Sequence, residues 1–88
     1  MDLFGVTITL PTKTIFAGEA SSLIVPAERG YLGVLAHHAP ILAHLKPGTI
    51  TLHDSSGKVL NFTLKSAGFL EVSGNKATLI LDSLELPS

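Results

Sequence analysis

The residues best suited to chemistry gather in one segment, residues 28–48, about a quarter of the chain. The segment contains the chain's single arginine, its single tyrosine and three of its four histidines, at Arg29, Tyr31, His37, His38 and His44. Imidazole is a common zinc or copper ligand, whereas tyrosine and arginine are enriched where proteins bind one another. These residue types suggest either a metal site or a protein interface.

The spacing of the histidines argues against a metal site. Neighbouring residues in an extended chain point to opposite faces, so His37 and His38 diverge. Pro40 interrupts any regular spacing to His44, and no carboxylate lies between these histidines to orient them. We therefore expect no metal and no cofactor, and we interpret the histidines as surface or interface residues.

An enzyme active site is not expected either. The serines lie in predicted strands or hairpin loops, without the strand-to-helix elbow that exposes a nucleophile. The glycines occur one per turn and no helix follows them, so no phosphate-binding loop is predicted. Asp54 and Asp82 can be paired on paper with His53 or His38, but nothing in the spacing requires such a pair.

Turn residues hold the 28–48 segment between flanking strands. Gly30 and Gly33 border a very short extended piece and permit a positive φ or a close approach there. Pro47 and Gly48 fit the two central positions of a type II turn. Loops held rigidly in this way commonly present binding surfaces. The tip at residues 28–31 is either such a surface or an ordinary solvated turn, and its residues alone leave both interpretations open.

The rest of the chain alternates apolar and polar residues with the period of β-strands, and no segment has helical periodicity. Gly18, inside a long second strand, predicts a bulge or bend. Short strands are predicted within residues 28–48, and others at residues 4–10, 13–25, 49–53, 60–65, 67–72 and, as the last strand, 77–81. The pattern predicts an all-β fold, a two-sheet antiparallel β-sandwich or flattened barrel of about eight to ten short strands.

Composition limits the classes of partner. The 88 residues suffice for one domain, residues 1–88, with a small core. With 45% hydrophobic and only 15% charged residues, apolar surface can remain outside that core for a partner. The net charge of −1 and the dispersed lysines argue against nucleic acid. The chain has no cysteine, no signal-peptide pattern and no bilayer-length apolar run, so any membrane role would be indirect.

The order and spacing of several motifs resemble one family. Within residues 28–48 the chain carries the pattern G-x-L-G-(x)4-H-A-P-(x)5-K-P-G, preceded by a strand and a T-x-F-x-G element at residues 14–18. Downstream, residues 68–72 are similar to a G-G-x-L-E-V segment, and residues 75–82 to an N-x-x-T-x-L-x-D run. Together these motifs resemble the epsilon subunit of rotary F-type ATP synthases over essentially the whole chain.

The resemblance implies a non-catalytic rotor subunit at the foot of the central stalk, on the cytoplasmic face of the energy-transducing membrane. It implies that the gamma subunit binds one side and the polar loops of the membrane c-ring another, so that torque reaches gamma without slip. By family position, a loop facing the c-ring would contain Glu28, Arg29, Gly30 and Tyr31. A region near gamma and the ring would contain His38, Pro40, Ile41, Leu42 and Ala43.

Two features depart from the family pattern. Family members often carry an acidic residue where Tyr31 stands, so aromatic packing would replace a charge contact with the ring. The family's second domain, a pair of antiparallel α-helices, is expected to be missing here, and with it the inhibition of ATP hydrolysis and any ATP site. The untagged start of the sequence favours a naturally short form.

A free-standing β-sandwich module that binds a carbohydrate or a peptide is the main alternative. A sugar platform needs exposed aromatic side chains, and the single tyrosine with no tryptophan argues against it. A small enzyme with a histidine-bound metal is the third interpretation.

Overall fold

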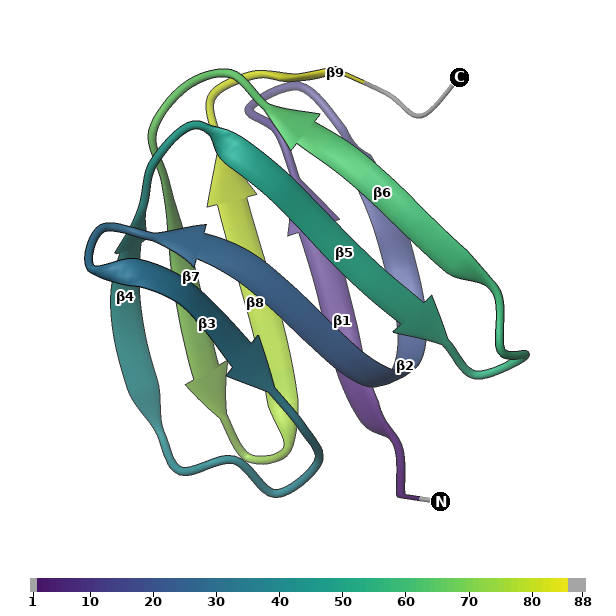
Figure 1. The fold of residues 1–88 in the computed structure, drawn as a ribbon. Coiled ribbons are helices and arrows are strands. Elements are labelled where there is room, and N and C mark those ends of the chain that lie inside the picture. Colours follow the sequence, from purple (N-terminus) through teal and green to yellow (C-terminus); the bar gives the residue numbers. More distant parts are fainter. Residues whose placement is uncertain (1, 86–88) are drawn as a thin grey trace.

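The computed structural model describes residues 2–85, which form nine β-strands and no helix (Figure 1). In chain order the strands are β1 (Phe4–Thr9), β2 (Thr14–Ala27), β3 (Gly30–Val34), β4 (Ile41–Leu45), β5 (Gly48–Asp54), β6 (Val59–Leu64), β7 (Gly68–Ser73), β8 (Lys76–Leu81) and β9 (Leu84–Glu85). The predicted all-β class and the predicted number of strands are confirmed.

Two layers of strands face each other across one core. One layer contains β1, β8, β7 and β4, and the other contains β3, β5, β6 and the short β9 (Figure 1). The 14-residue strand β2 belongs to both layers, because its first half pairs with β1 and its second half with β3, β4 and β5. The pairings of β2 with β1 and β4 close a ring, which gives the flattened barrel that the sequence predicts.

β2 passes between the layers through an irregularity in its register. Ala20 is buried, and strict alternation would next bury Ser22 and Ile24. Instead Leu23 is fully buried and Ile24 is 40% exposed, because the register with β5 shifts between Ala20 and Ser22. The extra residue, Ser21, thus exchanges the two faces of the strand.

The sequence predicts a bulge or bend at Gly18, which is too early in the strand. Gly18 pairs regularly with Val6 of β1. The ring of Phe16 lies over Gly18, and a Cβ atom at Gly18 would come within 3.3 Å of it. The glycine therefore makes room for an aromatic ring on the same face of the strand.

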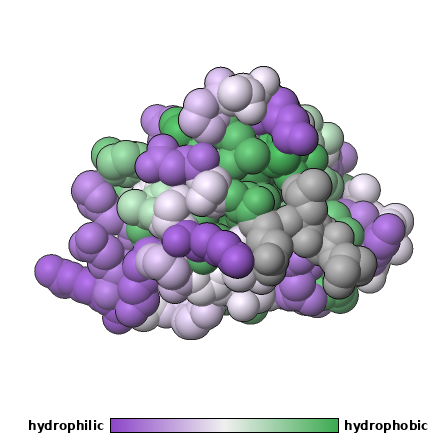
Figure 2. All heavy atoms as spheres, turned by 90° about the horizontal axis from the view of Figure 1, so that it is seen from above, coloured by the Kyte–Doolittle hydropathy of each residue, from purple (hydrophilic) through white to green (hydrophobic). Residues whose placement is uncertain are grey.

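The buried side chains of the described residues are all apolar. Outside the irregular strand β2 they follow the alternation that the sequence predicts, and they include Ile8, Leu52, Leu64, Leu70 and Leu79. Burying one such side chain stabilises the fold by about 1.5–3 kcal/mol. On the face seen from above, hydrophobic residues gather near the centre with hydrophilic residues around them (Figure 2).

Two details of the pairing go beyond the sequence pattern. β1 and β8 pair in parallel, whereas the other pairings within residues 2–85 are antiparallel. Alternation defines the faces of a strand and says nothing of its direction. β9, which pairs with β6, follows the strand predicted to be the last, because two residues are too few to show a period.

The hairpin loop predicted at residues 54–57 joins β5 to β6. The Asp54 carboxylate accepts hydrogen bonds from the Ser56 hydroxyl (2.8 Å), the Ser56 amide (2.9 Å) and the Lys58 amide (2.9 Å). These bonds, the Ser56 hydroxyl foremost, hold the pKa of Asp54 below its ordinary value of 3.8. Their contribution to stability is therefore present above pH 3.8 and is lost as the pH falls through the lowered pKa.

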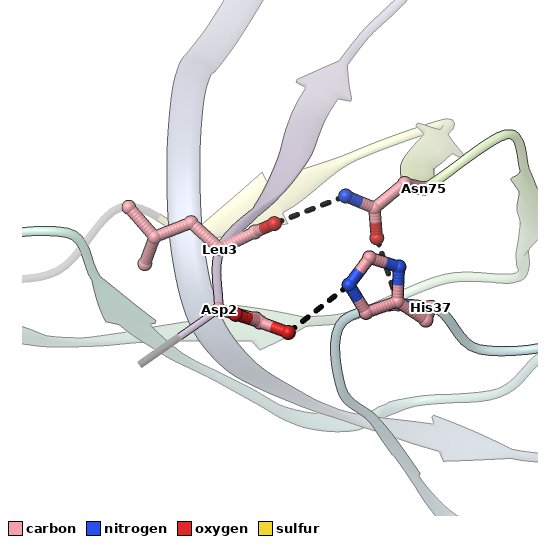
Figure 3. Close-up of polar contacts among 4 residues, drawn as sticks. All are labelled: Asp2, Leu3, His37 and Asn75. Carbon is pink, nitrogen blue, oxygen red and sulfur yellow. Dashed lines mark hydrogen bonds and ion pairs between the residues drawn. The ribbon is translucent and has the colours of Figure 1, made fainter.

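Asn75 fastens the loop after β3 to the N-terminal strand (Figure 3). Its side-chain NH₂ donates to the Leu3 carbonyl (3.0 Å), and its side-chain oxygen accepts from the His37 amide (2.7 Å). The His37 ring also pairs with the Asp2 carboxylate at 3.1 Å, but both side chains are mostly exposed. Exposed pairs contribute at most about 1 kcal/mol, so the two Asn75 bonds are the main fastening.

We predict that Asn75→Gly lowers the free energy of unfolding by about 1–2 kcal/mol, because glycine tolerates the positive φ but cannot make either hydrogen bond. His37→Asn is the control, since asparagine also tolerates a positive φ and only the exposed ion pair is lost. Its expected cost is at most about 0.5 kcal/mol. Urea unfolding at neutral pH measures both, and equal costs would contradict the prediction.

Candidate functional site

A surface groove of about 490 Å³ lies between the β2–β3 hairpin and β4. Its walls contain most of the predicted interface residues. The hairpin wall consists of Ala27, Glu28, Arg29, Gly30, Tyr31 and Leu32, and the β4 wall of Ile41, Leu42, Ala43 and His44. The fold thus brings together two parts of the predicted interface that are separate in the sequence.

Main-chain hydrogen bonds hold the hairpin against β4. Ala27 lies opposite Leu45, the Glu28 amide donates to the His44 carbonyl (3.1 Å), and the Lys46 amide donates to the Pro26 carbonyl (2.9 Å). The hairpin turns through residues 28–29 and leaves the turn at Gly30, whose φ of 128° strongly favours glycine. The groove is therefore a rigid feature of the ring.

Tyr31 holds the start of β5 beside the hairpin. Its hydroxyl oxygen accepts a hydrogen bond from the Thr49 amide at 3.1 Å, although the side chain remains 60% exposed. A Cβ atom at Gly48 would come within 2.7 Å of the Pro26 Cβ and 2.9 Å of the Tyr31 hydroxyl. The predicted type II turn is wrong, because Gly48 starts β5 without a positive φ. Glycine is needed there for close approach.

The groove combines an apolar floor with an exposed rim. Ile41 and Ala43 are half-buried and pack against the core, while Leu42 between them is 68% exposed. Glu28 and Arg29 are exposed at the hairpin tip. Such a surface, with apolar side chains turned outward and charges at one end, suits contact with another protein.

His38 and Pro40 lie outside this groove. His38 is half-buried in the loop between β3 and β4, where its Nδ1 lies 2.7 Å from the Ala39 carbonyl oxygen. Pro40 borders a shallower depression of about 340 Å³ on β4 and β7, which Leu42 and Glu71 also border. Leu42 thus lies between the groove and the neighbouring surface.

Sequence analysis missed an apolar row on the outer face of the β4–β7–β8 layer. The His44 ring packs on the Phe69 ring with centroids 4.7 Å apart, and Ile80 lies opposite Phe69 on the next strand. Phe69 is 42% exposed and Ile80 51% exposed. The sequence did contain a signal for this row. In β7 and β8 an apolar residue, Phe69 or Ile80, occupies an outward position next to an inward leucine, Leu70 or Leu79.

The three histidines of residues 28–48 lie in different surroundings. Within residues 2–85 no three histidine or acidic side chains are placed to hold a metal ion. The part of the chain that the structure describes contains no helix long and apolar enough to cross a membrane.

A family model described as "ATP synthase, Delta/Epsilon chain, beta-sandwich domain" matches residues 3–87. The chain belongs to this family. The ATP synthase epsilon chain of Protochlamydia amoebophila is 40% identical to it over 83 residues, which are 94% of this chain and 56% of that protein. The ATP synthase epsilon chain of Chlorobaculum tepidum is 42% identical over 81 residues, which are 92% of this chain and 91% of that protein.

The chain therefore spans about half the length of some epsilon-chain relatives and nearly all of others. Two solved structures share the fold. A chain of the Euglena gracilis mitochondrial ATP synthase (OSCP/F1/c-ring) superposes with a TM-score of 0.85 at 22% identity over 92% of this chain and 51% of that one. A chain of the Tetrahymena thermophila enzyme (central stalk/c-ring) gives 0.75 at 21% identity over 91% and 63%.

We predict that Gly48→Ala lowers the free energy of unfolding by about 1–3 kcal/mol, because the added methyl group meets Pro26 and Tyr31 in a packed corner. Gly33→Ala is the matched control, since a Cβ atom at Gly33 has no neighbour within 4 Å and its φ is not positive. The control should change stability by at most about 0.5 kcal/mol. Urea unfolding of both variants measures the difference, and a cost at Gly33 as large as at Gly48 would contradict it.

Proposed function

We propose that this chain is a non-catalytic central-stalk subunit of a rotary proton-translocating ATP synthase, where it couples the gamma subunit to the membrane c-ring. The observation that carries the proposal is the groove, in which the family's two partner segments meet on one rigid surface of an epsilon-family domain. The domain performs no group transfer and needs no cofactor for this role. It works as a peripheral protein on the cytoplasmic face of the energy-transducing membrane.

Stiffness is the mechanical property that this role requires. Ring closure through β2 leaves the layers joined by main-chain hydrogen bonds as well as by the core. A load applied at one end of such a ring reaches the other without a flexible hinge. Residues 1–88 act in this proposal as a single β-sandwich domain.

The two walls of the groove differ in chemistry, and this difference supports the proposal that one wall contacts the c-ring and the other contacts gamma. The tip at residues 28–31 carries exposed Glu28 and Arg29 and suits the polar loops of the c-ring. The β4 wall, with Ile41, exposed Leu42 and Ala43, suits an apolar surface of gamma. Pro40 and His38 extend this second contact toward the loop before β4.

We predict that Leu42→Ser weakens retention of gamma roughly tenfold, because it removes an exposed apolar contact worth 1–2 kcal/mol. Val59→Ser is the control, since Val59 is 47% exposed at the start of β6, on the other side of the molecule (Figure 1). The assay mixes each tagged variant with purified gamma and measures the bound fraction by titration. Equal losses in both variants, or none in Leu42→Ser, would count against the gamma assignment.

We predict that Arg29→Glu impairs docking to the c-ring and proton-driven ATP synthesis while gamma binding stays within about twofold, because Arg29 is an exposed charge at the hairpin tip, whereas the proposed gamma contact is the apolar β4 wall. Lys58→Glu, a charge reversal in the β5–β6 loop, is the control. Reconstituted vesicles report synthesis, and titration with gamma reports binding. Loss of gamma binding with normal synthesis would reverse the assignment of the two walls.

A further inference from the structure

The groove lies along two strand edges that are mostly without a partner strand in residues 2–85. β3 pairs with β2 alone. β4 pairs with β7 on one side, but on the other side, within the described residues, it meets β2 only at its end, where Leu45 lies opposite Ala27 and the His44 carbonyl accepts from the Glu28 amide. The remainder of β4, Ile41 to His44, forms one wall of the groove beyond the end of β2. We call the space between these edges of β3 and β4 the seam.

The register shows which main-chain groups face outward from β3. Ala27 lies opposite Gly30 across a two-residue turn, so Gly30 and Leu32 direct their N–H and C=O groups toward β2. Tyr31 and Gly33, at the intervening positions, direct theirs away from β2. Unpaired groups of this kind form a template for a further strand.

β4 also has main-chain groups that face the seam. The Glu28 amide bonds the His44 carbonyl, which shows that His44 faces the side of β2. Leu42, two positions earlier, directs its N–H and C=O groups to that same side, where the described chain places no strand opposite it.

The seam also has a defined side-chain character. Its floor consists of Leu32, Ile41 and Ala43, which are half-buried and pack against the core. Neither β3 nor β4 carries Asp, Glu, Lys, Arg or Pro, the residues that commonly protect a strand edge. The seam is apolar and uncharged except at its hairpin end, where Glu28 and Arg29 lie, so it is complementary to an extended chain with an uncharged centre.

We propose that the seam binds an extended segment of a partner protein, which adds to the edge of β3 as a further strand. The segment has an uncharged centre of about five residues, the length of β3, with apolar side chains at alternate positions against the floor. The inference rests on the proposed function only for which protein supplies the segment. A second copy of the chain paired through β3 would leave the β4 wall uncovered, so we favour a partner segment.

The test uses the ¹⁵N-labelled chain and the capped peptide Lys-Thr-Val-Thr-Val-Thr-Lys. The expected result is a saturable shift of the Tyr31, Gly33 and Leu42 amide signals, with slower hydrogen exchange at Tyr31 and Gly33. The same peptide N-methylated at its three central residues should bind at least roughly tenfold more weakly, because it cannot pair its main chain. No variant is needed, so a folding defect cannot obscure the result.

Three results would overturn the proposal. These are the absence of saturable binding at millimolar peptide, equal affinity for the methylated peptide, and shifts confined to the open edge of β6 at Val59 or to another face. The experiment is independent of the ATP synthase role. If the peptide pairs at the seam but the chain does not retain gamma, the proposed binding at the seam stands and the proposed function is contradicted. Retention of gamma without peptide pairing would do the opposite.

Discussion

The extra residue in β2 is the constraint on which the rest of the structure depends. Without the register shift at Ser21, strict alternation would turn Leu23 outward and bury Ser22 and Ile24. With it, one strand presents Ala20 to the core through its first half and Leu23 through its second, so it can serve both layers. Ring closure follows from this single strand, and so does the position of the hairpin that continues it.

The groove is a consequence of how β2 ends. Its last residues pair with β4 on one side and β3 on the other, which fixes the hairpin tip beside Leu42. Tyr31 then joins this corner to β5 by its hydrogen bond with the Thr49 amide. The corner is so closely packed that it has no room for a side chain at Gly48. Residues that contact partners in our proposal are therefore held by main-chain bonds between the hairpin and β4 and by the Tyr31 side-chain bond to β5, and these supports let them transmit force.

Much of the fold was predictable because burial imposes a period of two on every strand. Phe62 and Leu64 illustrate this, since they alternate with the polar residues Asn61 and Thr63 in the sequence and both are buried. The parallel pairing of β1 with β8 and the bulge at Ser21 depend on tertiary contacts, and no local residue type announces them. At Gly48 the sequence predicted a type II turn, and this was wrong because the glycine is needed for the close approach of Pro26 and Tyr31, which only the packed structure reveals. The sequence shows that Phe69 and Ile80 are apolar residues at outward positions. Only the pairing of the strands shows that they lie beside His44.

The most direct measurement is hydrogen exchange of this chain, alone and assembled with gamma and the c-ring. Protection is expected to increase at Tyr31, Gly33 and Leu42, whose amides have no partner strand in the described part of the isolated domain, and to stay unchanged in the β5–β6 loop. Protection confined to β6 and the loop at residues 54–57, with none at the groove, would contradict this prediction. Failure of the chain to assemble with gamma and the c-ring at all would contradict it equally.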